Sequence, residues 1–172
     1  MKIAIITGAS RGIGRACAIE LAKSGIKVIA NYNNSEDLAK SLQVDLKNQG
    51  IEIDIYRADV SKKDEVKKLV KYALDKYGKI DILINNAGIS QIKVFTEITD
   101  EDWENMINTN LTSVFYMTRE VLSNMIHNKN GDIINISSVW GTIGGSCETH
   151  YSATKAAVIG MSKALAKEVR TI

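Results

Sequence analysis

Tyr151 and Lys155 are the residues of this sequence whose type and spacing point most directly to chemistry. They lie four residues apart in the segment Tyr-Ser-Ala-Thr-Lys, about one helical turn, so on a helix both side chains project from the same face. A lysine charge beside a phenol favours the phenolate form, which lets a tyrosine give or take a proton near neutral pH. The pair therefore predicts an acid–base group on a helix.

A glycine-rich turn stands at the other end of the chain. It reads Thr7-Gly8-Ala9-Ser10-Arg11-Gly12-Ile13-Gly14, and it follows an apolar stretch and opens an amphipathic one, the context in which such turns bind nucleotides. Backbone N–H groups at the start of a helix receive a pyrophosphate, assisted by the helix dipole. The alternative is a loop that only needs positive φ angles. Taken with the tyrosine and the lysine, the turn predicts hydride transfer to or from a carbonyl.

Composition limits the possible classes of protein. The 172 residues suit one domain, 45% hydrophobic and 24% charged content are typical of a globular protein, and the net charge is +2. No basic stripe supports nucleic-acid binding, and no apolar run approaches the ~20 residues of a membrane span. Cys17 and Cys147 lie far apart and lack metal-ligand spacing. We expect a cytoplasmic protein without a metal site.

Apolar and amphipathic stretches alternate along the whole chain. We expect strands at 2–7, 27–31, 51–57, 80–84 and 132–137, and helices at 12–24, 35–48, 62–77, 100–126 and 151–170. Candidate helix ends are Ser35, Ser61, Thr99 or Asp100 as N-caps and Gly78 as a C-terminal stop. Such alternation gives parallel strands joined by right-handed crossovers. The prediction is an α/β fold, a doubly wound, Rossmann-like parallel sheet in three α/β/α layers, in one domain over residues 1–172.

The motifs together resemble the short-chain dehydrogenase/reductase family. Thr-Gly-x-x-x-Gly-x-Gly differs from the usual Gly-x-Gly-x-x-Gly spacing and matches that family instead. Further matches follow in the family's order: Asp59-Val60, Asn85-Asn86-Ala87-Gly88, Asn110, Ser138, and Tyr151 with Lys155. They run from Thr7 to Lys155, nearly the whole chain.

The resemblance implies a catalytic role for each of four residues. Tyr151 would be the general acid for carbonyl reduction and the base for the reverse reaction, assisted by Lys155. Ser138 would hold and polarise the substrate carbonyl, and Asn110 would position a water that links Lys155 to solvent. The neighbours Ser137 and Asn108 compete for these positions, but strand alternation and the thirteen-residue spacing to Tyr151 favour Ser138. We expect His150 to line the substrate entrance or to face water.

The family also implies which residues contact the dinucleotide. They are Gly8, Ser10, Arg11, Gly12, Ile13, Gly14, Asn33, Asp59, Val60, Asn86, Ala87 and Gly88, with Tyr151 and Lys155. NAD enzymes place a carboxylate near the end of the second strand, whereas residues 30–34 contain none before Glu36. Arg11 offers a cation for a 2′-phosphate, although it could be a solvated surface charge. We expect NADP(H) rather than NAD(H).

Within the family the sequence is closest to the 3-oxoacyl-[acyl-carrier-protein] reductase branch. The resemblance includes the glycine turn, Asn135-Ile136-Ser137-Ser138 and the stretch from Gly160 to Glu168. It implies NADPH-dependent reduction of a 3-oxoacyl thioester in fatty acid biosynthesis, by a homo-oligomer such as a dimer or tetramer. Sugar or polyol dehydrogenases share these segments and stay an alternative, as does a non-catalytic dinucleotide-binding protein.

The chain departs from the family pattern at its C-terminus. Family members continue for some seventy residues, with two more strands, a Pro-Gly turn and a helical flap over the substrate. This sequence stops at Ile172 and contains no proline. We expect an incomplete domain, a fragment or shortened reading frame that is inactive alone, with Ile133, Ile134 and Ile136 on an open sheet edge.

Overall fold

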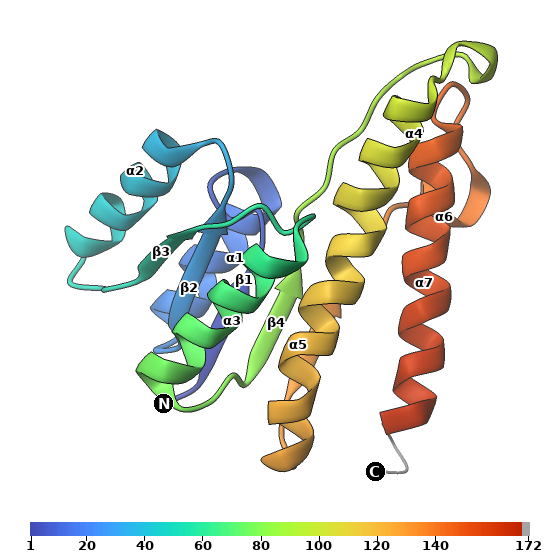
Figure 1. Ribbon diagram of the computed structural model, residues 1–172. Helices are drawn as coiled ribbons and strands as arrows, with labels where there is room; N and C mark the ends of the chain where they lie inside the picture. Colours follow the sequence, from blue (N-terminus) through green and yellow to red (C-terminus); the bar gives the residue numbers. More distant parts are fainter. Residues whose placement is uncertain (170–172) are drawn as a thin grey trace.

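The computed structural model describes residues 1–169 and shows a parallel sheet flanked by helices (Figure 1). The strands are β1 (Ile3–Ile6), β2 (Lys27–Tyr32), β3 (Asp54–Arg57), β4 (Ile82–Asn85) and β5 (Asp132–Asn135). Their order in the sheet is β3-β2-β1-β4-β5, and all four pairings are parallel. The predicted doubly wound, Rossmann-like sheet is confirmed, because the order runs outward in both directions from β1.

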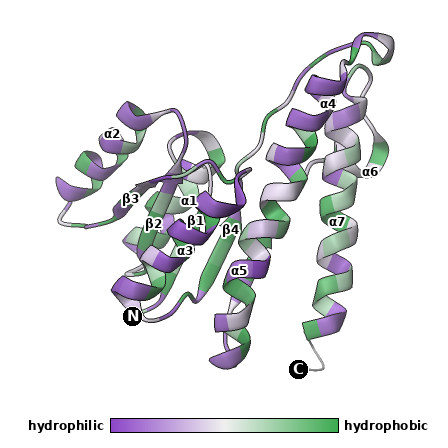
Figure 2. Cartoon of the chain, viewed as in Figure 1, coloured by the Kyte–Doolittle hydropathy of each residue, from purple (hydrophilic) through white to green (hydrophobic). Residues whose placement is uncertain are grey.

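Helices cover both faces of this sheet. They are α1 (Gly12–Lys23), α2 (Glu36–Lys47), α3 (Lys63–Tyr77), α4 (Asp100–Ile107), α5 (Ser113–His127), α6 (Trp140–Ile143) and α7 (Thr149–Val169). Side chains alternate along β1: Ile3 and Ile5 join the core under α3 and α5, whereas Ala4 and Ile6 join the core under α1 and α2. Figure 2 accordingly shows the central strands as mostly hydrophobic, whereas α2 has both hydrophilic and hydrophobic stretches.

Several predicted helix ends differ from the structure. Thr99 does cap α4, through a capping box with Asp102, and Gly78 ends α3 at a φ of 75°. Ser35 stands at the N-cap of α2 without a capping hydrogen bond. Ser61 is not the cap of α3, because its hydroxyl donates to Asp59 Oδ1 at 2.7 Å.

The predicted helix 100–126 is also not uniform. A π-helical segment, Asn108–Thr112, separates α4 from α5. Wide turns of this kind occur often at functional sites, and this one contains the buried Asn110. Trp140–Ile143 and a 3₁₀ turn at Phe95–Glu97 were not predicted. The predicted end of the last helix, Arg170, lies outside the described residues.

Strand β5 forms an edge of the sheet within residues 1–169. It pairs with β4 alone, and Ile134 is 47% exposed. A groove of about 770 Å³ runs beside this edge. Its apolar lining comes from α5, β5 and α7, including Leu122, Met125, Ile133, Leu165 and Val169. The predicted open edge is therefore present in this part of the chain.

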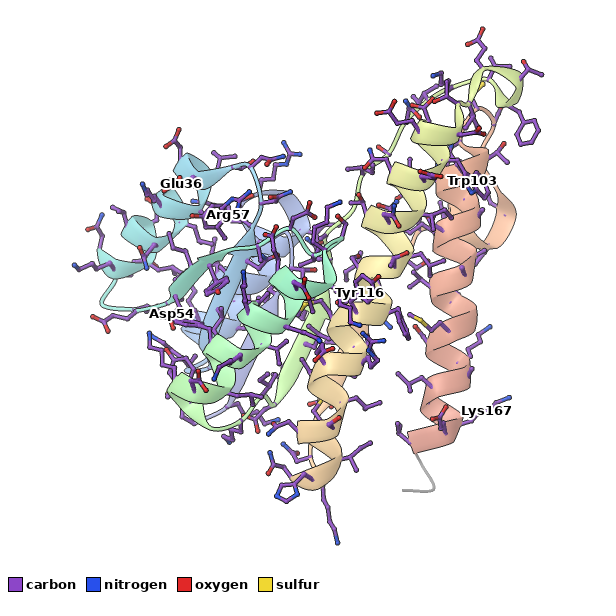
Figure 3. All side chains as sticks on the ribbon, in the orientation of Figure 1. Glu36, Asp54, Arg57, Trp103, Tyr116 and Lys167 are labelled. Carbon is purple, nitrogen blue, oxygen red and sulfur yellow. The ribbon has the colours of Figure 1, made fainter. Side chains whose placement is uncertain are left out.

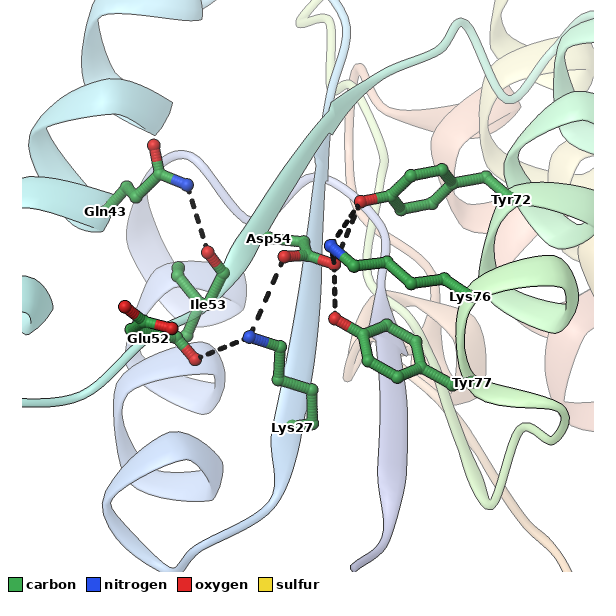
Figure 4. A network of polar contacts seen from close by, with 8 residues as sticks. All are labelled: Lys27, Gln43, Glu52, Ile53, Asp54, Tyr72, Lys76 and Tyr77. Atoms are coloured by element: carbon green, nitrogen blue, oxygen red, sulfur yellow. Dashed lines mark hydrogen bonds and ion pairs between the residues drawn. The ribbon is translucent and has the colours of Figure 1, made fainter.

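The carboxylate of Asp54 ties β3 to α3 and β2 at the opposite end of the strands from the glycine turn (Figure 4). Its Oδ2 accepts hydrogen bonds from Tyr72, Lys76 and Tyr77 at 2.9, 2.8 and 2.6 Å, and Lys27 lies 3.7 Å from Oδ1. Burial raises the pKa of the Asp54 carboxyl, but the bonds from Lys76, Tyr77 and Tyr72 outweigh burial and leave it below its ordinary value. The carboxylate stabilises the fold in its charged form.

The glycine turn is held by the loop after β4. Asn86 Nδ2 donates to the carbonyls of Thr7 and Gly8, both at 3.0 Å, while Thr7 Oγ1 accepts from the N–H groups of Asn86 and Ala87. A Cβ on Gly14 would collide with the same Asn86 amide and with the Gly8 carbonyl. Only glycine lets α1 start this close to β4.

We predict that Asp54→Asn lowers the free energy of unfolding by about 2 kcal/mol at pH 7, the contribution of a hydrogen-bonded charged group. A lowered folded-state pKa gives stability that is present above the unfolded value, about 4, and is lost as the pH falls below it. The deficit of the variant, measured by urea unfolding, should therefore shrink between pH 7 and pH 3. Asp75→Asn, which removes an exposed ion pair with Lys71, should cost less than about 0.5 kcal/mol. An equal deficit at both pH values would contradict this role of the charge.

A second prediction concerns the glycine turn. Gly14→Ala should destabilise the protein by about 1–3 kcal/mol, because a rigid backbone carbonyl occupies the added methyl's position. The matched change is Gly160→Ala on α7, where an added Cβ meets no atom within 4 Å apart from the helix's own nearby backbone. It should stabilise the protein by about 0.5–1 kcal/mol. Thermal unfolding of both variants measures this difference, and similar effects of the two would show that the contact with Asn86 is loose.

Candidate functional site

The candidate site lies where the carboxyl ends of β1, β4 and β5 meet the start of α1 and the first half of α7. Ligands bind at this edge of open parallel sheets. A Cβ on Gly88 would lie 3.3 Å from Asn110 Oδ1 and 3.7 Å from Lys155 Nζ. The loop after β4, the π-helical segment and α7 thus meet at one point, although they are far apart in sequence.

Lys155 is the buried charge of this site. It is 5% exposed, and its Nζ donates to the Ile136 carbonyl, just past β5, at 2.8 Å. It forms no ion pair within residues 1–169. Burial lowers the pKa of the Lys155 ammonium, with no carboxylate to oppose this effect. The site therefore contains a cation that lacks a counter-charge.

Tyr151 lies one turn before this cation on the same helix. Lys155 Nζ is 5.7 Å from the centre of the Tyr151 ring, and the tyrosine is partly buried. The backbone carbonyl of Tyr151 accepts from Thr154 Oγ1 at 2.7 Å. Both predicted residues are thus together on the helix face that the spacing indicated.

Asn110 connects the helical layer to the loop after β4. Its Oδ1 accepts from Ile89 N–H and its Nδ2 donates to Ile89 C=O, both at 2.8 Å. The side-chain amide thus binds both backbone polar groups of Ile89, as the backbone of a neighbouring β-strand would. Nδ2 also lies 3.4 Å from Thr154 Oγ1 on α7. Asn108, the competing residue, is exposed. Of the two asparagines, Asn110 therefore lies at the site, and its side-chain amide binds the backbone of Ile89.

The two serines after β5 have different surroundings. Ser137 Oγ donates to the backbone carbonyl of Lys155 at 2.8 Å and so secures α7. Ser138 Oγ accepts from Trp140 N–H at 3.2 Å, a contact that leaves its own hydroxyl hydrogen to donate elsewhere. A donor at the carboxyl end of a strand is what a substrate carbonyl requires.

The glycine turn has room for a phosphate group. Gly8 and Gly12 have φ angles of 63° and 55°, and a Cβ on Gly12 would meet no atom within 4 Å. Ile13 is 61% exposed at the start of α1, and Arg11 is exposed beside it. Ser10 is 7% exposed. An uncovered apolar side chain and a cation beside a helix N-terminus fit a dinucleotide's pyrophosphate and sugar.

Arg57 lies at the end of β3 and Glu36 at the start of α2, just after β2 (Figure 3). Arg57 Nη2 donates to Asn33 Oδ1 at 3.4 Å. Glu36 pairs with Lys40 at 2.8 Å. The hydrogen bond and charge of Lys40, with a smaller contribution from Arg57, hold the pKa of the Glu36 carboxyl below its ordinary value.

The other residues predicted to bind a dinucleotide have structural contacts as well. Asp59 Oδ1 accepts from the N–H and hydroxyl of Ser61 at 3.0 and 2.7 Å, and Val60 is buried in the core. Asn86, Ala87 and Gly88 form the loop against the glycine turn. The structure thus gathers all these residues at the carboxyl edge of the sheet.

Three polar residues near the site, His150, Asn31 and Gln91, were misplaced or missed by the sequence reasoning. His150 neither lines an entrance nor faces water, because it is 0% exposed and its Nε2 lies 2.8 Å from Gln91 Oε1. Asn31, buried in β2, accepts from Gly8 N–H and donates to Ala58 C=O. A polar residue inside an apolar strand was a signal for Asn31, whereas no local pattern marks Gln91.

Comparison with known proteins adds the family. The model of the family described as short chain dehydrogenase matches residues 2–172. The chain is 44% identical to a 3-oxoacyl-[acyl-carrier-protein] reductase of Synechocystis sp.. It is also 42% identical to the 3-oxoacyl-[acyl-carrier-protein] reductase FabG of Thermotoga maritima and 40% identical to the FabG reductase of Staphylococcus epidermidis. Each match covers 98% of this chain and 68–69% of the relative.

No helix within residues 1–169 is long and apolar enough to span a membrane. Membership of the family implies a nicotinamide dinucleotide as cofactor, which the turn described above fits. The chain belongs to the short-chain dehydrogenase family and is an oxidoreductase acting on CH–OH or carbonyl groups.

Proposed function

We propose that this protein reduces 3-oxoacyl thioesters of acyl-carrier protein to the 3-hydroxyacyl form, with NADPH as reductant and Tyr151 as proton donor. The observation that carries the proposal is the buried, unpaired ammonium of Lys155 beside the phenol of Tyr151. Three relatives that are 40–44% identical bear the name of this reductase. A homo-oligomer is part of the proposal.

The protein's own residues supply orientation and the proton. The glycine turn would hold a reduced nicotinamide dinucleotide, which would supply the hydride for the carbonyl carbon. The Ser138 hydroxyl donates to the carbonyl oxygen and holds it beside Tyr151. As that oxygen gains negative charge, Tyr151 transfers its phenolic proton to it, which completes the alcohol. The resulting phenolate is stabilised by the Lys155 ammonium.

Proton return to Tyr151 needs a route from solvent. The Lys155 ammonium, 5.7 Å from the centre of the Tyr151 ring, is the donor that we assign to this step, and its bond to the Ile136 carbonyl fixes its position. Asn110 contributes by holding the backbone of Ile89 beside Gly88, where a water could link Lys155 to solvent. The side-chain amide of Asn110 is itself occupied by that backbone.

Exposed apolar residues favour an acyl chain over a sugar as substrate. They lie in the loops after β4 and β5, which Lys93 N–H joins to the Cys147 carbonyl at 2.7 Å. The most exposed are Ile92, Val94, Phe95, Val139 and Ile143. A sugar or polyol needs convergent polar groups, whereas an acyl chain gains from apolar contact.

The first test of this function is Tyr151→Phe. Loss of the proton donor should lower kcat for an acetoacetyl thioester by about a hundredfold to ten-thousandfold, while the Kd for NADPH, measured by fluorescence, stays nearly unchanged. Tyr116→Phe, on α5, is the matched control and should keep normal turnover. Full activity of the Tyr151 variant, or turnover of polyols in place of the thioester, would refute the proposal.

The cofactor preference has its own test at Arg11. We predict that Arg11→Ala weakens NADPH binding by about tenfold or more, the effect of losing one hydrogen bond to a charged group. Binding of NADH, which lacks the 2′-phosphate, should not change. Lys40→Ala removes a neighbouring cation that is already paired with Glu36 and should leave both affinities as they are. Equal losses for the two cofactors in the Arg11 variant would show that Arg11 does not select between them.

A further inference from the structure

His150 is a buried polar residue that the proposed mechanism does not use. It is 0% exposed in the first turn of α7 and directly precedes Tyr151. Its Nε2 lies 2.8 Å from Gln91 Oε1 in the loop after β4. Its Nδ1 is buried and has no hydrogen-bond partner among residues 1–169.

The protonation of this imidazole follows from its neighbours. Gln91 Nε2 donates at 2.8 Å to Asp102 Oδ1, and an ionised carboxylate only accepts. The amide is thereby oriented with its oxygen toward His150, so the ring must donate from Nε2. Nδ1 then carries the lone pair and no hydrogen in the neutral ring. The chain Asp102–Gln91–His150 has one direction of donation.

Asp102 keeps this direction fixed. Its Oδ2 accepts from Lys93 Nζ at 2.6 Å and from the N–H and hydroxyl of Thr99. Hydrogen bonds from Lys93, Gln91 and Thr99 hold the pKa of the Asp102 carboxyl well below its usual range, and the bond from Lys93 has the largest effect. The carboxylate therefore stays ionised, and the Gln91 amide keeps its Nε2 toward Asp102 and its Oε1 toward His150.

Residues 89–94, which we call the strap, are fastened at every second position. Ile89 is held by the Asn110 amide, Gln91 by His150 and Asp102, and Lys93 by the Cys147 carbonyl and Asp102. Ile92, between Gln91 and Lys93, and Val94, after Lys93, are exposed. The strap therefore connects Asn110 with the beginning of α7.

The first turn of a helix needs such a fastening. Its leading N–H groups have no intrahelical acceptor, so helix ends fray. Tyr151 lies in this weak turn, while Lys155 one turn later is secured by Ser137 and by the close approach of Gly141 to its backbone. The bond between His150 and Gln91 secures the turn with the phenol from the side of the strap, and Ser152 Oγ, which accepts from Gly145 N–H at 3.0 Å, holds it to the loop before α7.

We propose that His150 and Gln91 are positioning residues that fix Tyr151 relative to the strap and Asn110. This inference rests on the proposed function. It assigns His150 a structural proton on Nε2 and no proton transfer of its own. Displacement of a reacting group by about 1 Å can cost a hundredfold in rate, so the tie affects the chemical step more than ligand affinity.

Kinetics of three variants test the tie. His150→Phe keeps a ring without the donor and should lower kcat by about tenfold to a hundredfold, with the KM and the Kd for NADPH nearly unchanged. His150→Gln restores a donor and should recover most of the lost kcat. Gln91→Leu removes the other partner of the same bond and should reproduce the loss of kcat. Because Gln91 is partly exposed, this variant keeps the test available if His150→Phe does not fold. Thr96→Ala, on the exposed 3₁₀ turn, is the control and should have normal kcat.

Unchanged kcat in both His150→Phe and Gln91→Leu overturns the proposal, as does an equal loss in His150→Gln. Should the unsubstituted protein reduce no carbonyl compound, the proposed function fails and the tie is decided by NMR. In ¹⁵N-histidine spectra His150 should be protonated at Nε2 and bare at Nδ1. Gln91→Leu should shift the ring signals of Tyr151, and Thr96→Ala should not. The opposite tautomer, or unmoved Tyr151 signals, refutes the tie independently of activity.

Discussion

The burial of the Lys155 ammonium without a carboxylate is the constraint on which the site depends. Removing a charge from water is unfavourable unless hydrogen bonds or opposite charge compensate. Here the Ile136 carbonyl supplies one hydrogen bond, and residues 1–169 supply no ion pair. The remaining deficit makes a nearby negative charge favourable. A phenolate on Tyr151 is the group on the same helix face that can provide it.

The fold explains how this cation comes to be held in place. The residue just past β5, Ile136, supplies the carbonyl that binds Nζ, because parallel strands all direct their carboxyl ends to one edge. Gly141 lets α6 approach the backbone of Lys155, and Gly88 leaves space beside its ammonium. The same edge receives the glycine turn, which Asn86 holds by bonding to the carbonyls of Thr7 and Gly8. The glycine turn and the Tyr151–Lys155 pair are thus fixed by one sheet.

Local patterns in the sequence were enough for the architecture. Alternating apolar and amphipathic stretches gave the parallel sheet, and the short-range chemistry of Thr99 and Gly78 gave two helix ends. The Tyr151–Lys155 spacing also placed both side chains correctly, since a four-residue interval has one meaning on a helix. These features depend on residues close together in the chain.

Contacts between distant residues could not be predicted in this way. The burial of His150 depends on Gln91, 59 residues earlier, and adjacency to Tyr151 suggested exposure instead. The π-helical segment follows from the fit of Asn110 between Ile89 and α7. Serine is a common N-cap residue, but the Ser61 hydroxyl donates to the Asp59 carboxylate instead of capping α3. In the first two cases a tertiary hydrogen bond outweighed a local preference, and at Ser61 one local hydrogen bond replaced another.

Titration of Lys155 measures the buried charge most directly. Lysines labelled with ¹³C at Cε can be followed by NMR against pH, and the Lys155 signal is assigned by its loss in Lys155→Met. An uncompensated buried ammonium should titrate below the ordinary lysine value of about 10.4, apart from the exposed lysines. Titration of Lys155 together with those lysines would contradict the account of Lys155 as a buried charge without a counter-charge.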